Sequence, residues 1–326
     1  MKMNIKMVQN AAAVFVVSAL FASNLCAQER NDVIKVYNEG VKVMQTDVKA
    51  AIAAFENVVA LSDKVGETAS DLKQKAAQVL PGLYVKDASN ALTEKKPAPE
   101  IIKAAKAAAK AAEKYSSATS KENAGKLLVQ GYYMLGTEYF SKKDNENALL
   151  AFDSLLAINP NYNSAIYNKA LIYRSQNNSA NFEQTIDLYL DKVKSSNDAE
   201  KIKQASTLAL EYFRAAGSKA NIANKLDEAL NNLNKAAKYG DDKDLFYFFA
   251  DVYNKQKNFD NGATYAQKGL DLETGDATAK AKFYFQLALA QAGKGQTDVA
   301  CATFKNSMYG PFTEPSKAQR AILKCK

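Results

Sequence analysis

Apolar and small residues between positions 129 and 162 recur twice with the period of an α-helix. Leu135, Gly136 and Tyr139 fall on one face of a first helical stretch, and Ala148 and Phe152 fall on one face of a second. The polar run SKKDNEN at 141–147 separates the two stretches and has the length of a connection between antiparallel helices. The pattern therefore predicts a helical hairpin with small residues where its two helices approach each other.

The spacing within this hairpin resembles the 34-residue tetratricopeptide (TPR) repeat. With Val129 as position 1, the large, Leu-Gly, Tyr, Ala, aromatic and Pro residues of the family pattern are matched at positions 4, 7, 8, 11, 20, 24 and 32 by Tyr132, Leu135, Gly136, Tyr139, Ala148, Phe152 and Pro160. Position 27 departs, because Leu155 stands where a small residue is usual. The resemblance implies that further hairpins stack against this one, since a single hairpin cannot bury its apolar face.

Related spacings recur on both sides of the clear repeat. The residues at the repeat positions are Tyr37, Gly40, Ala51 and Phe55 in repeat one (36–62); Ile166, Ala170, Tyr173, Thr185 and Tyr189 in repeat four; Leu208, Ala209, Tyr212, Ala229, Leu233 and Ala236 in repeat five; Phe246, Phe249, Ala250, Tyr253, Phe259, Gly262 and Ala266 in repeat six; and Tyr284, Leu287, Ala288, Ala300 and Phe304 in repeat seven. Repeat five is interpreted with an insertion of about eight residues around GSKANIAN. The predicted fold is an all-α, right-handed α-solenoid of about seven TPR-like hairpins with a C-terminal capping helix in PSKAQRAILKC.

Residues 66–120 match the repeat least well. Pro81 and Gly82 should kink or break a long first helix there, because proline lacks an amide donor. The alanine- and lysine-rich stretch that follows begins with proline and has high helix propensity. We interpret this region as a degenerate hairpin.

The first 27 residues have the form of a secretory signal. Lys2 and Lys6 precede an apolar run of twelve residues at 11–22, which is too short to span a membrane. Cys26 could alternatively carry a lipid, but the large Leu25 before it disfavours lipidation. The predicted organisation is a signal peptide at 1–27, degenerate TPR-like hairpins at 28–120, and a TPR array with its cap at 121–326. The expected location is the bacterial periplasm or a site at the outer membrane, with no transmembrane span in the mature chain.

Composition argues against catalysis and against metal binding. The chain has no histidine, the commonest general base and transition-metal ligand, and it has no phosphate-binding glycine loop. Its three cysteines have no metal-ligand spacing. The net charge of +8 falls to +6 when Lys2 and Lys6 are removed, which a solvated surface explains without nucleic acid. We expect a non-catalytic protein without cofactor, metal or nucleic-acid partner; its oligomeric state stays open.

The resemblance also implies a binding surface. In the TPR family, positions 2, 5, 9, 12 and 13 of the first helices line a concave groove for a peptide or protein segment. The partner-binding candidates in that row are Tyr133, Tyr167, Arg174, Lys203, Arg214, Tyr247, Asn254, Lys255, Lys282 and Phe285. Aromatic residues provide contact area at low entropic cost, and Arg or Lys can pair with carboxylates. Taken singly, the tyrosines can also be packing residues and the lysines solubilising ones.

Two other functions stay open beside groove binding. One is a structural scaffold of the cell envelope, and the other is glycan binding through the groove tyrosines. The carboxylate clamp of chaperone-adaptor TPR domains is not supported, because Tyr133 and Thr137 stand where its lysine and asparagine belong.

The two C-terminal cysteines are aimed at a common interface. Cys301 lies on the second helix of repeat seven, on the side expected to face the cap. Ala318, Ala321, Ile322 and Cys325 form a helical stripe that we expect to be the inward face of the cap. Since disulfides persist in exported proteins, the sequence predicts a Cys301–Cys325 bridge. The alternative is two small buried side chains in contact.

Overall fold

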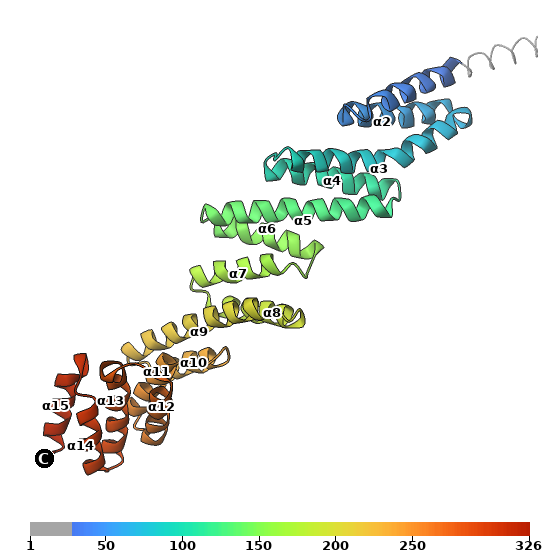
Figure 1. Ribbon diagram of the computed structural model, residues 1–326. Helices are drawn as coiled ribbons and strands as arrows, with labels where there is room; N and C mark the ends of the chain where they lie inside the picture. The colour runs from blue at the N-terminus through green and yellow to red at the C-terminus, as the bar shows by residue number, and fades with distance from the viewer. Residues whose placement is uncertain (1–27) are drawn as a thin grey trace, which may run out of the picture. The chain divides into compact units, whose positions relative to one another are not determined.

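A computed structural model describes residues 28–326 (Figure 1). The expected signal peptide and Cys26 therefore lie outside the described residues. The chain divides into two compact units, residues 1–165 and 166–326. The domain boundary expected at 120/121 falls inside the first unit, within the first turn of the helix α5 (Ala118–Ser141).

Helices make up both units, and the described residues contain no strand. The first unit holds a helix at 28–43, followed by α2 (Val48–Val65), η1 (Glu67–Ala69), α3 (Ser70–Thr93), α4 (Ala98–Lys114), α5 (Ala118–Ser141) and α6 (Asn145–Ile158). Next come α7 (Asn163–Ser175), which begins at the end of the first unit, α8 (Ser179–Ser195), α9 (Ala199–Ile222), α10 (Leu226–Ala237), α11 (Lys243–Lys255), α12 (Phe259–Leu272), α13 (Ala277–Gly293), α14 (Thr297–Asn306), η2 (Gly310–Phe312) and α15 (Thr313–Ile322). The described α-helices pair into seven hairpins followed by a terminal helix, as predicted.

The two helices of a hairpin pack closely where a small residue on one lies opposite a large buried residue on the other. A Cβ atom at Gly136 in α5 would lie 2.6 Å from Cε1 of Phe152 in α6, and Phe152 is completely buried. The same relation joins Gly40 to Phe55 in the first hairpin, where a Cβ would lie 3.2 Å from the ring. Close-packed interiors leave no room for a side chain at such points, so repeat position 8 has to be small.

The helix containing Pro81 is continuous, contrary to the break that the sequence suggested as one possibility. α3 runs from Ser70 to Thr93 through Pro81, which is itself buried. Leu80 and Leu83 on either side belong to the core that α3 forms with α2. Proline removes one backbone hydrogen bond from the helix, and the burial of its neighbours offsets that loss. The degenerate region forms a hairpin, α3 with α4, as predicted.

Repeat five needs a correction of register. A Cβ atom at Gly217 would lie 2.7 Å from Cδ2 of Leu233 and 3.2 Å from the backbone oxygen of Ala229. Gly217 therefore takes position 8, for which the sequence pattern predicts Ala209. The residues of GSKANIAN up to Ile222 belong to α9 and are no insertion in the turn. The extra length lies at the N-terminal end of α9. The same is true of α5, and both helices are 24 residues long.

Most turns within and between hairpins contain a residue in the left-handed region. Lys143 (φ 61°), Asn177 (φ 54°) and Lys257 (φ 61°) each end the first helix of a hairpin. In each case the next residue caps the following helix with its side chain, as Asp144 does for the amide of Asn147. The left-handed residue reverses the chain in three residues, which keeps consecutive helices antiparallel.

The terminal helix α15 turns a different face inward than the sequence suggested. Ala318 and Ala321 are exposed, and Ile322 is 70 % exposed. The buried residue of α15 is Ser316, whose hydroxyl lies 2.7 Å from that of Ser307. A short helix with one buried serine places little apolar surface against α14, so its apolar stripe is left to solvent. The structure joins Cys301 to Cys325, with Cα atoms 5.6 Å apart.

The corrected register predicts that Gly217 tolerates no larger residue. Gly217→Val should destabilise the folded chain by about 1–3 kcal/mol, because the added methyl groups overlap Leu233 and the α10 backbone. Gly125→Val is the matched control, since a Cβ there meets only Ile158 at 4.0 Å. Urea unfolding followed by circular dichroism measures both. Equal effects of the two substitutions would contradict the register.

Candidate functional site

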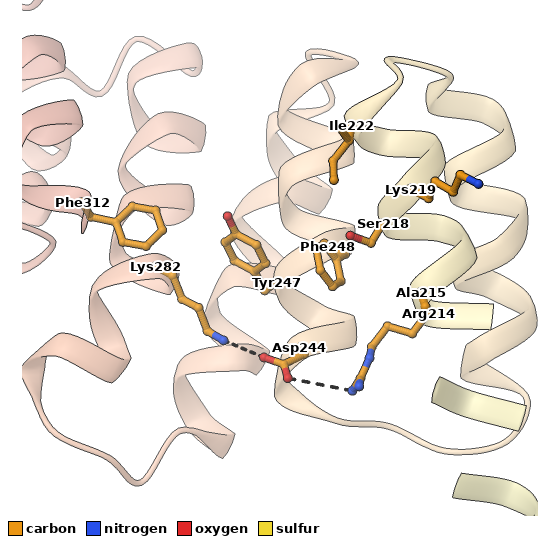
Figure 2. A pocket seen from close by; sticks show the side chains of 10 residues that line it. All are labelled: Arg214, Ala215, Ser218, Lys219, Ile222, Asp244, Tyr247, Phe248, Lys282 and Phe312. Atoms are coloured by element: carbon orange, nitrogen blue, oxygen red, sulfur yellow. Dashed lines mark hydrogen bonds and ion pairs between the residues drawn. The ribbon is translucent and has the colours of Figure 1, made fainter. Parts of the chain in front are cut away.

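The second unit contains a pocket on the first helices of its last three hairpins. Its cavity volume is about 670 Å³. The lining side chains come from α9, α11, α13 and η2 (Figure 2), and they are Arg214, Ala215, Ser218, Lys219, Ile222, Asp244, Tyr247, Phe248, Lys282 and Phe312. α9 packs against α11, and α11 packs against α13, so equivalent faces of three hairpins meet at this pocket.

The centre of the pocket is apolar and open to solvent. Tyr247 and Phe248 project from α11 between Ile222 on one side and Phe312 on the other (Figure 2). Ile222, at the end of α9, is 83 % exposed. An exposed isoleucine beside aromatic rings gains free energy when a partner covers it, at about 25 cal/mol per Å² of apolar surface removed from water.

Charged side chains form one edge of the pocket. Asp244 accepts a hydrogen bond from Lys282 at 2.6 Å, and the Arg214 guanidinium lies 4.0 Å from its other oxygen (Figure 2). Arg214 also pairs with Asp242, which caps the N-terminus of α11. Burial raises the pKa of Asp244, but the hydrogen bond and charge of Lys282, with the charge of Arg214, outweigh it and lower the pKa below its ordinary value. Asp244 is thus an anion at neutral pH.

The aromatic centre and the charged edge share Lys282. Its ammonium nitrogen lies 5.5 Å from the ring centroid of Tyr247 and 4.9 Å from that of Phe283. Burial, followed by the charge of Asp251, raises the pKa of Tyr247 above its ordinary value, so its phenol stays protonated. The pocket therefore offers a neutral hydroxyl and aromatic faces beside a paired aspartate, and these groups can contact a ligand.

A polar network beneath the pocket ties the three helices together. Asp251 in α11 accepts hydrogen bonds from Asn221 of α9 at 2.6 Å and from Gln286 of α13 at 3.0 Å. Lys255 pairs with Asp251 at 2.8 Å and donates to Asn221 at 2.9 Å. Asn221 and Gln286 are only 4 % and 2 % exposed, so their amide groups depend on these partners. Asn254 adds a bond from α11 to the backbone oxygen of Gln286.

Comparisons with known proteins find only a distant likeness to solved structures. No protein-family model and no curated protein matches this sequence. Solved structures that resemble it include MamA protein, with 19 % identity over 60 % of this chain and 94 % of that one and a TM-score of 0.34. Another is a tetratricopeptide repeat protein from Parabacteroides merdae, with 17 % identity over 91 % and 99 % and a TM-score of 0.29. YrrB, described as a TPR protein with an unusual peptide-binding site, shares 15 % identity over 55 % and 84 % with a TM-score of 0.32.

Agreement this low carries no argument about fold or function. The decisive observation is the chain's own geometry. The described α-helices pair into seven hairpins, and in two of them the glycine at position 8 lies against position 24, at Gly136 with Phe152 and at Gly217 with Leu233. The chain folds as an array of helical hairpins whose close contacts resemble those of TPR repeats. In this array the pocket lies on the first helices, where the resemblance implied a groove.

Three of the ten candidate residues line the pocket, and three more contact residues on the same helices. Arg214, Tyr247 and Lys282 line it. Phe285 lies behind it, with its ring centroid 5.4 Å from that of Phe312. Asn254 and Lys255 belong to the polar network. In the corrected register Arg214 takes position 5, whereas the sequence pattern predicts position 13 for it.

The other four candidates lie elsewhere. Tyr133 in α5 packs against Tyr162, with ring centroids 5.2 Å apart, and belongs to the first unit. Tyr167 in α7 packs against Tyr189 of α8 at 4.9 Å. Arg174 does not line the pocket but an adjoining depression, which shares Arg214, Ala215 and Lys219 with it. Lys203 is exposed on the N-terminal extension of α9, outside the groove row because the register of repeat five shifts.

Several lining residues are not predicted by the repeat pattern, for identifiable reasons. Asp244 stands at position 2 of repeat six, so the family pattern could have found it. Ser218 and Ile222 were hidden by the register of repeat five. Phe312 follows the last repeat, and no repeat position points to it.

Within residues 28–326 no group of three or more His, Cys, Asp or Glu residues could hold a metal ion. No helix of that part of the chain combines the length and the apolar character needed to cross a membrane.

The network predicts a large effect at Asp251. Asp251→Ala should destabilise the chain by about 2–4 kcal/mol, because the buried amides of Asn221 and Gln286 lose their acceptor. Asp227→Ala, which removes an exposed bond from Gln256, is the control and should change stability by less than about 0.5 kcal/mol. Thermal unfolding of the purified variants measures both. Matching midpoints for the two variants would show that the network is dispensable.

Proposed function

We propose that this chain is a non-catalytic binding protein that holds a peptide or protein segment in the pocket on α9, α11 and α13. The observation that carries the proposal is the apolar centre, the exposed Ile222 with the half-buried Tyr247 and Phe248, beside the charged edge at Asp244. A segment with an apolar side chain for the centre and polar groups for the edge complements both parts. The rigid first helices present these side chains without rearrangement, which reduces the entropic loss on binding.

The arrangement also fits a segment better than a small reactive substrate. The pocket is open along the helices, and its charged groups are paired with one another instead of being poised for proton transfer. Mixed apolar and charged surfaces of this kind recognise extended chains through one or two anchor side chains.

The binding test compares two exposed isoleucines. The protein is screened against an immobilised array of 12-residue peptides of varied sequence, and the peptides retained are then titrated in solution. Ile222→Ser should weaken their affinity about tenfold, since it removes apolar surface that the peptide covers. Ile322 on α15 is also exposed but lies outside the pocket, so Ile322→Ser should leave the affinity for the peptides unchanged.

Two results would redirect the assignment. If the array retains no peptide while crosslinking yields a folded partner protein at another surface, the envelope-scaffold alternative is favoured. If glycans bind at Tyr247 and compete with peptides for the pocket, the glycan alternative is favoured instead.

We further propose that the protein acts in the cell envelope after export. The support is the basic start and apolar run of residues 1–27, together with cysteines placed where a disulfide can form. Mass spectrometry of the protein from fractionated cells should find a chain beginning at Gln28 outside the cytoplasm. Recovery of the intact 326-residue chain from the cytoplasm would remove this part of the proposal.

A further inference from the structure

Phe312 is the one lining residue of the pocket that comes from outside the helical hairpins. It belongs to η2, the short turn between α14 and α15. Figure 2 shows its ring on the far side of Tyr247 from Ile222 and Phe248, above Lys282. Without this ring, the apolar centre would be open toward the end of the array.

The position of Phe312 depends on contacts at both ends of its turn. Its ring packs against Phe285 at 5.4 Å, and Phe285 packs against Phe304 of α14 at 5.7 Å. The buried hydroxyls of Ser307 and Ser316, one on each side of η2, are hydrogen-bonded at 2.7 Å. The ring is therefore placed by α13 and α14 on one side and by α15 on the other.

Apolar burial contributes little to the attachment of α15. Ser316 is its buried residue, and Ile322 is 70 % exposed. Leu323, just beyond the helix, packs on the cluster around Phe304. Burial of one partly covered leucine is small against the entropy of ordering a segment of more than ten residues.

The covalent link supplies what burial does not. Cys301 in α14 and Cys325 after α15 are 24 residues apart and joined, and the loop that they close contains η2 and Phe312. Arg320 of α15 donates a hydrogen bond to the backbone oxygen of Cys301 and another, at 2.8 Å, to that of Lys326. Closing the loop restricts the unfolded cap far more than the folded one.

We propose that Phe312 is a specificity-determining wall of the pocket, which fits it for one large apolar side chain of a bound peptide, and that the Cys301–Cys325 bridge positions this wall. The ligand class rests on the function proposed above, but the positioning does not. Reduction by a dithiol transfers two electrons and two protons to the bridge. It gives two thiols while the reductant closes to its own disulfide. The cap then detaches, Phe312 leaves the pocket, and the binding of large apolar side chains weakens.

The absence of tryptophan from the chain allows a direct test of positioning. Phe312→Trp places a single indole at the wall, and Tyr212→Trp places one on α9 against Phe182 as a control in the same unit. On reduction with dithiothreitol, the emission of Trp at 312 should shift to longer wavelength and become more sensitive to iodide quenching. The control emission should not change. Cys301→Ser with Cys325→Ser in the Phe312→Trp background should show the shifted emission without any reductant.

The specificity is tested with a defined probe, N-acetyl-L-phenylalaninamide, and its serine analogue, by saturation-transfer NMR. The oxidised protein should bind the phenylalanine compound in preference to the serine compound. Phe312→Ala and the double serine variant should each bind it about tenfold more weakly. Phe312→Leu, which keeps an apolar wall, should restore most of the binding.

Each part can fail separately. Unchanged emission at 312, with both thiols shown to be free by titration, overturns positioning by the bridge. Equal binding of N-acetyl-L-phenylalaninamide by the wild type and Phe312→Ala overturns the specificity role. A peptide array without any bound peptide, together with a shift at 312 on reduction, would refute the proposed function and leave the positioning intact.

Discussion

The close approach of two helices within a hairpin is the constraint on which the rest of this structure depends. Where Gly136 faces Phe152 and Gly217 faces Leu233, the ring or branched side chain of one helix fills the space that the other leaves by having no Cβ. This contact sets the distance and rotation of the second helix relative to the first. Once those are fixed, the opposite faces of the first helices are set as well, and their side chains become a common surface.

The surface in the second unit combines a buried polar network with an apolar surface. Asn221, Asp251 and Gln286 satisfy one another beneath the pocket and hold α9, α11 and α13 in register. Buried amides and a carboxylate can do this only in one relative placement of the helices, because hydrogen bonds are directional. In the pocket, Ile222 remains exposed and Phe248 is half-buried. The polar layer thus provides the rigidity that lets an apolar surface stay uncovered in the free protein without collapsing onto a neighbouring helix.

At the C-terminal end of the chain, a disulfide holds a segment that buries little apolar surface. α15 has little apolar surface to bury, and its stripe of Ala318, Ala321 and Ile322 faces solvent. The link from Cys301 to Cys325 and the hydrogen bonds of Arg320 and Ser316 hold the segment instead. This explains how a helix of ten residues can bring Phe312 to the pocket.

The amino-acid sequence by itself determined the helical class and the seven hairpins with their terminal helix. Those features follow from local periodicity, from glycine and alanine spacing, and from polar turns, which act over a few residues. Only the tertiary structure decided that α3 passes through Pro81, that Gly217 and not Ala209 makes the close contact, and that Phe312 joins Tyr247 at one pocket. A buried proline is tolerated because of neighbours distant in sequence, and two small residues eight positions apart in one helix are equivalent until the facing side chain is known. Phe312 reaches the pocket because a loop closed between two cysteines returns the chain to α13, and no local pattern encodes that return.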